Sequence, residues 1–112
     1  MSDSAFRQAF NLAWADWSGS RHDAFDARLI RLKCMHEIEM EAIRGGASEE
    51  TISRMGHCVD RAAAVLRRLC HHEVWMLDAF EDRVAMVRSR RAALGGLSAT
   101  VLRFPIERVR SA

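Results

Sequence analysis

The sequence has little that would break a helix or cross a membrane. Its single proline is Pro105, and only one glycine, Gly56, lies between Ser48 and Leu94. No apolar run approaches the roughly 18 residues that a membrane-spanning helix needs. The first residues also lack the basic and apolar blocks of a signal peptide. We therefore expect a cytoplasmic, globular chain whose 112 residues form one domain by length.

The motifs of common enzyme classes are missing as well. The sequence has no Gly-rich phosphate loop and no nucleophile elbow, and no glutamate stands three residues before a histidine, as di-iron bundles require. Glu37 and Glu41 share a helix face from which Glu39 points away, and a solvated stripe explains them better than a catalytic pair. We predict that the chain is not an enzyme and needs no cofactor.

An apolar repeat is the strongest pattern that is present. Alternate steps of three and four residues from Ile52 to Val87 meet apolar side chains at nine of eleven positions. This is the spacing of a helix packed against other helices. It predicts one long helix over about residues 48–94, capped by Ser48 and followed by two glutamates that suit the helix dipole.

Two shorter helices are expected before the long one. The first spans about residues 3–17, capped by Ser2 or Asp3, and its aromatic stripe belongs to the core. The second runs from a capping box at Ser20 to about residue 44, where two glycines end it. The short glycine turn predicts an antiparallel hairpin with the long helix. The fold class is therefore all-α, a helical hairpin or elongated helical bundle over residues 1–96.

The second half of the long helix lacks a cover in this arrangement. Either the first helix continues collinearly past Gly19 and covers Met76 and Phe80, or a second subunit does so, and we expect a homodimer. A break near His71 and His72, which would give a compact four-helix bundle, is the alternative. No helix breaker occurs there, so the continuous helix is the leading prediction.

Each of the three cysteines has a histidine within two positions. The odd number indicates reduced thiols rather than a disulfide framework. The hairpin brings Cys34 level with Cys58 and His36 near them, and thiolate and imidazole are ligands that zinc or copper would take. A metal or redox sensor at Cys34, Cys58 and His36 is therefore one hypothesis. Helical residues two apart point about 200° apart, which argues against a complete four-ligand site, and a core cysteine is usually an apolar filler.

Positive charge gathers at the C-terminal end. Residues 1–82 carry 10 basic and 14 acidic residues, net −4, whereas residues 83–112 carry 7 arginines and one glutamate, net +6. Beyond the glycine pair at 95–96, residues 97–112 lack a helical period and form a predicted irregular tail that either folds back on the bundle or docks on a partner. The predicted partner-binding residues are Leu102, Arg103, Phe104, Ile106, Arg108, Val109 and Arg110.

Nucleic-acid binding is the alternative function. Phosphates would be contacted by Arg83, Arg88, Arg90 and Arg91. The alternative is that Arg88, Arg90 and Arg91 only complement the negative end of the long helix. Residues 51–69 look like a helix-turn-helix with a turn at Gly56. The helix surface that would contact base edges consists of alanines. The apolar spacing also continues without a shift on both sides of Gly56, so a continuous helix is the better interpretation.

The leading hypothesis is a small helical module that binds another protein. It would act as an adaptor, a chaperone or an inhibitor of a larger assembly, by presenting helical faces and a basic, apolar tail. Nucleic acid is the second partner class, and metal or redox sensing is the third hypothesis.

Overall fold

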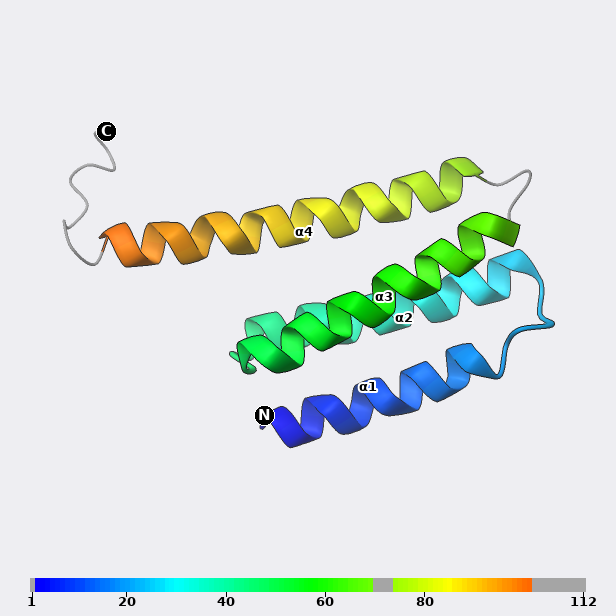
Figure 1. The fold of residues 1–112 in the computed structure, drawn as a ribbon, viewed down its shortest axis with the longest axis horizontal. Helices are drawn as coiled ribbons and strands as arrows, with labels where there is room; N and C mark the ends of the chain where they lie inside the picture. Colours follow the sequence, from blue (N-terminus) through cyan, green and yellow to red (C-terminus); the bar gives the residue numbers. More distant parts are fainter. Residues whose placement is uncertain (1, 70–73, 102–112) are drawn as a thin grey trace. The chain divides into compact units, whose positions relative to one another are not determined.

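The structure, a computed structural model, describes residues 2–69 and 74–101. Within these residues the chain forms the helices α1 (Asp3–Ser18), α2 (Phe25–Arg44), α3 (Glu49–Leu69) and α4 (Val74–Val101), and no strand (Figure 1). The all-α prediction is confirmed. The chain divides into two compact units, residues 1–82 and 83–112. This boundary coincides with the change from net negative to net positive charge along the sequence.

The beginnings of α1 and α3 follow the local capping signals. The Ser2 hydroxyl accepts a hydrogen bond from the Ala5 amide at 3.2 Å, and the Ser48 hydroxyl accepts one from the Thr51 amide at 3.2 Å. Both predicted caps are confirmed.

The predicted capping box at Ser20 is wrong. Ser20 is buried, and its hydroxyl donates to the carbonyl oxygen of Trp17 at 2.7 Å, just after the end of α1. The hydroxyl therefore does not cap α2, which begins four residues later than the box implied, with Ala24 as its N-cap.

The two glycines after α2 serve different needs. Gly46 has φ 74°, a left-handed conformation that favours glycine, and its amide bonds to the Ile43 carbonyl at 3.3 Å. Gly45 provides space, because a Cβ there would lie 2.5 Å from the Cζ of Phe6. The turn lets α3 pack against α2, which confirms the predicted hairpin.

Helix α1 doubles back along α2, so the expectation that it would continue collinearly past Gly19 is wrong. Its first residues lie at the turn between α2 and α3, where Asp3 binds Ser48 and Phe6 approaches Gly45. Helices α1 and α3 therefore run in the same direction, and α2 runs opposite to both (Figure 1). Helix α2 packs against both α1 and α3, whereas α1 and α3 contact each other only sparsely.

The prediction of one continuous helix over residues 48–94 is not confirmed. Arg67 of α3 forms ion pairs with Asp78 at 2.7 Å and Glu81 at 2.6 Å, both in the first turns of α4. Arg67 and Glu81 are 14 residues apart, which is about 21 Å along a continuous helix and too far for contact. Helix α4 therefore turns back toward α3 instead of continuing it. This agrees with the alternative of a break near residues 71–72, although residues 70–73 lie outside the described residues.

This reversal changes which apolar side chains are buried. The predicted seam is buried as far as Leu66, but Leu69 is 59% exposed, and α4 restarts the pattern with Leu77 and Phe80. The Phe80 ring meets His36 of α2 edge-on, with ring centroids 5.8 Å apart. Because Phe80 is covered within one chain, it no longer calls for a second subunit. The core of residues 1–82 contains Phe6, Phe10, Trp17, Leu29, Leu32, Met35, Ala42, Ile52, Met55, Val59, Ala62, Ala63, Leu66, Leu77 and Phe80.

The end of the long helix also differs from the expectation. Helix α4 continues through Gly95 and Gly96 to Val101, so the predicted helix end at these glycines is not confirmed. Glycine costs a helix only about 1 kcal/mol relative to alanine, and alanines and leucines flank the pair. The division into a bundle over residues 1–96 and a tail over 97–112 stays a prediction.

Candidate functional site

Two hollows lie one after the other between α1 and α3, the two helices that contact each other sparsely. One of about 570 Å³ lies near the beginnings of the two helices and one of about 370 Å³ toward their ends. We call this surface the α1–α3 groove. It is lined by Arg7, Phe10, Asn11, Trp14 and Trp17 of α1 and by Glu50, Thr51, Ser53, Arg54, Met55, His57, Cys58, Arg61, Ala62, Ala64, Val65 and Arg68 of α3.

The floor of the groove is apolar because both helices turn an edge of their core face toward it. On α1 the lining side chains recur every three or four residues, and Phe10 is buried while Trp14 is half-buried. On α3 Met55 is buried, and Cys58 and Val65 are half-buried. An apolar partner surface would therefore find side chains to pack against along the groove.

The edge of the groove on α3 is positively charged. Arg54, Arg61 and Arg68 are all exposed, and Arg7 extends from the α1 side. Among the described lining residues, Glu50 is the one carboxylate. The groove therefore combines an apolar floor with a basic edge.

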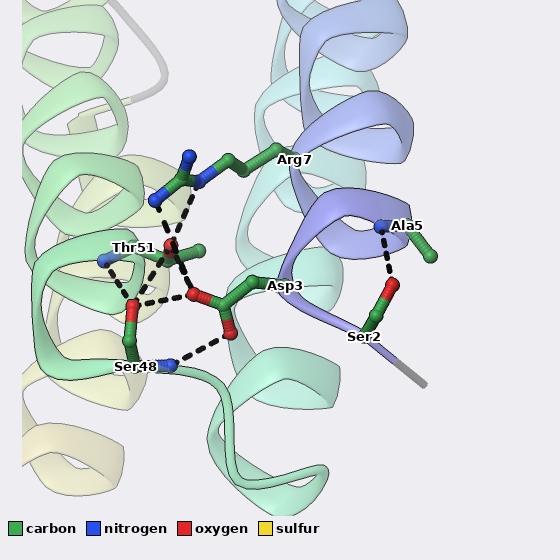
Figure 2. Close-up of polar contacts among 6 residues, drawn as sticks. All are labelled: Ser2, Asp3, Ala5, Arg7, Ser48 and Thr51. Carbon is green, nitrogen blue, oxygen red and sulfur yellow. Dashed lines mark hydrogen bonds and ion pairs between the residues drawn. The ribbon is translucent and has the colours of Figure 1, made fainter.

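A polar network closes one end of the groove by joining α1 to α3 (Figure 2). The Asp3 carboxylate accepts hydrogen bonds from the Ser48 amide at 2.9 Å, from the Ser48 hydroxyl, and from the Thr51 hydroxyl at 2.8 Å. The Arg7 Nε donates to the Thr51 hydroxyl at 2.9 Å and its guanidinium lies 4.0 Å from Asp3. Because Arg7 and Thr51 also line the groove, this network fixes the position of its walls.

The network gives Asp3 a pH-dependent role in stability. Hydrogen bonds from Ser48, then those from Thr51, hold the pKa of the Asp3 carboxyl below its ordinary value of 3.8, and Arg7 adds to this. A lowered folded-state pKa contributes stability above the unfolded-state pKa, and that stability is lost as pH falls through the lowered pKa. We expect Asp3→Asn to lower the melting temperature at neutral pH, with the difference from wild type narrowing as the pH falls below 3.8 and through the lowered pKa of Asp3.

Thermal denaturation followed by circular dichroism at several pH values measures this effect. Asp82→Asn is the matched control, because Asp82 is exposed and its carboxylate has no hydrogen bond or ion pair among the described residues. A gap between wild type and Asp3→Asn that stays constant with pH would show that the charge of Asp3 does not matter.

The predicted metal ligands are not brought together. Cys34 is exposed on α2, whereas Cys58 lies in the α1–α3 groove. His36 is buried, with its Nδ1 3.1 Å from Oε1 of Glu39. Across the described parts of the chain, no group of three or more histidine, cysteine, aspartate or glutamate side chains is placed to hold a metal ion. The cause is the helical angle, since residues 34 and 36 point to different sides of α2.

The residues predicted to bind nucleic acid lie on α4. Arg83 and Arg90 are exposed, and Arg88 and Arg91 are half-buried. The helix-turn-helix alternative is wrong, because α3 runs unbroken through Gly56 from Glu49 to Leu69. The predicted partner-binding residues of the tail, Leu102 to Arg110, lie outside the described residues.

Two features of the structure were not predicted from the sequence. One is the α1–α3 groove, for which the spacing of Arg54, Arg61 and Arg68 at every seventh residue is a signal on one helix edge. The other is the burial of Glu39 with His36. The sequence indicated only that Glu39 points away from the neighbouring glutamates.

Comparison with protein-family models gives no match, and comparisons with curated proteins and with solved structures give none either. In the part of the chain that the structure describes, no helix is long and apolar enough to cross a membrane.

Proposed function

We propose that this chain is a non-enzymatic protein–protein interaction module of the cytoplasm, and that its partner binds in the α1–α3 groove. An adaptor, a chaperone and an inhibitor of a larger assembly would all use such a surface. The observation that supports the proposal is the groove itself, with its apolar floor and charged edge. Protein interfaces combine an apolar centre with a polar rim in the same way.

The dimensions of the groove suit an extended partner better than a small molecule. The lining residues of α3 run from Glu50 to Arg68, a length of about 27 Å at the helical rise. Both hollows are open to solvent, so the groove offers a surface rather than an enclosed chamber. Binding a helix in a groove between two helices is a common mode of peptide recognition.

Site-specific photocrosslinking in cells of the native host tests this proposal. A photoreactive amino acid at Asn11, which is exposed and lines the groove, is expected to form an adduct with a protein. The same amino acid at Lys33, exposed on α2 and outside the groove, serves as the matched control and is expected to form none. Adducts of equal yield from both positions, or adducts to nucleic acid alone from Asn11, would overturn the proposal.

Nucleic-acid binding through α4 is a second candidate function. The exposed Arg83 and Arg90 are seven residues apart, which places them on one face of α4 two turns from each other. Phosphate contacts would make affinity fall steeply as salt rises. A homodimer and a role for the tail residues stay predictions beside these candidates.

A further inference from the structure

The charge of the groove indicates the kind of partner that it takes. We infer that the α1–α3 groove binds an acidic amphipathic helix of a partner protein, with its apolar side on the groove floor and its carboxylates along α3. This inference rests on the proposed function and names the partner class for the same surface.

The arginines along α3 form a straight row. Arg54, Arg61 and Arg68 are seven residues apart, so each lies two turns from the next and only about 20° further around the helix. Their guanidinium groups therefore recur about every 10 Å along the groove. A partner helix with a carboxylate at every seventh residue would match this row in either direction.

These three arginines are also uncompensated within the described part of the chain, where none forms an ion pair. Other arginines do: Arg31 pairs with Asp16 and Asp23, and Arg67 pairs with Asp78 and Glu81. The groove arginines therefore do not stabilise the fold through ion pairs, and their positive charge is available to a ligand. Opposite charges across an interface raise the association rate and select the partner.

The apolar floor of the groove favours a helix over a nucleic acid as the occupant. Phosphate backbones bind to positive charge without an apolar surface, whereas an amphipathic helix needs partly exposed side chains such as Trp14, Cys58 and Val65 to pack on. The two walls also contact each other sparsely, and a bound helix would pack against both.

A designed peptide of about 18 residues, the length of the groove at the helical rise, is the probe. It carries leucine at the a and d positions of a heptad and glutamate at the e and g positions. A matched peptide carries lysine in place of glutamate. Fluorescence anisotropy measures both affinities. We expect wild type to bind the acidic peptide at least tenfold more tightly than the basic one, which is 1.4 kcal/mol or more.

Reversing the row of charges should reverse this preference. The variant Arg54→Glu/Arg61→Glu/Arg68→Glu is expected to lose at least tenfold in affinity for the acidic peptide and to gain affinity for the basic one. The matched control is Arg21→Glu/Lys33→Glu/Arg44→Glu, which changes the net charge equally at exposed basic residues outside the groove. Its affinity for the acidic peptide should change less than threefold. Equal losses in both variants would overturn the inference, because they would indicate attraction to net charge alone.

Cysteine alkylation locates the bound peptide. In a Cys70→Ser background, the acidic peptide is expected to slow alkylation of Cys58, which lines the groove, and to leave Cys34 on α2 unchanged. Binding without protection of Cys58 would place the peptide elsewhere and overturn the inference.

A single-stranded DNA oligonucleotide tests whether a nucleic acid, rather than an acidic helix, occupies the groove. If it binds through the arginine row while the acidic peptide does not bind, the occupant is a nucleic acid and the inference fails. If the peptide fails to bind but Asn11 still forms protein adducts in cells, only the acidic-helix inference is wrong. If those adducts are absent too, the proposed function is wrong as well.

Discussion

Replacing Phe80 with alanine is expected to lower the free energy of unfolding by about 3–5 kcal/mol. Phe80 is only 5% exposed, and its ring contacts His36 of α2 edge-on. The substitution removes these contacts and leaves a cavity that the surrounding helices fill only in part. Urea denaturation followed by circular dichroism measures the loss.

Trp75 provides a matched control on the same helix. It is 70% exposed, so Trp75→Ala should change the free energy of unfolding by no more than about 0.5 kcal/mol. A double-mutant cycle with His36→Ala then tests the contact itself, with an expected coupling of about 0.5–3 kcal/mol. If α3 and α4 formed one straight helix, Phe80 would lie far along it from His36, and the coupling would be zero. Zero coupling would therefore contradict the chain reversal.

The local elements were predictable because their causes are local. Ser2 and Ser48 cap their helices through their own side chains, and Gly46 ends α2 through its own backbone conformation. The apolar period of α3 correctly gave the buried face as far as Leu66. In each case the residues that decide the structure are within a few positions of one another.

The chain reversal after Leu69 was not predictable from these signals, although a break there was the alternative. A hairpin of two amphipathic helices and one long amphipathic helix have nearly the same apolar spacing, and neither proline nor glycine marks the difference here. The burial of Phe80 against His36 favours the hairpin over one long helix, and these two residues are distant in sequence. Ser20 shows the same limit, because its buried hydroxyl bonds to Trp17 instead of capping α2.

The candidate site was predictable only in part. Helical angles were enough to argue against a complete four-ligand metal site near Cys34 and His36. The groove depends instead on which side of α3 is left open when α1 and α2 pack, and periodicity does not report this. The row of Arg54, Arg61 and Arg68 was visible in the sequence, but its relation to α1 appears only in three dimensions.

The buried pair of His36 and Glu39 leads to the second large effect. Their side chains are 3% and 2% exposed, and His36 Nδ1 lies 3.1 Å from Oε1 of Glu39. The other ring nitrogen of His36, Nε2, is buried without a hydrogen bond among the described residues. Glu39→Ala would leave both ring nitrogens without a protein partner, and a buried polar group that loses its partner is costly. We expect a loss of about 3 kcal/mol in the free energy of unfolding.

Two further variants separate the hydrogen bond from the carboxylate as such. Glu37→Ala removes an exposed carboxylate two residues away on the same helix and should cost no more than about 0.5 kcal/mol. Glu39→Gln keeps an acceptor for His36, so its loss should fall between those of the two alanine variants. If Glu39→Ala costs no more than Glu37→Ala, the pair contributes nothing to stability. If Glu39→Gln costs as much as Glu39→Ala, the negative charge and not the acceptor is what the core requires.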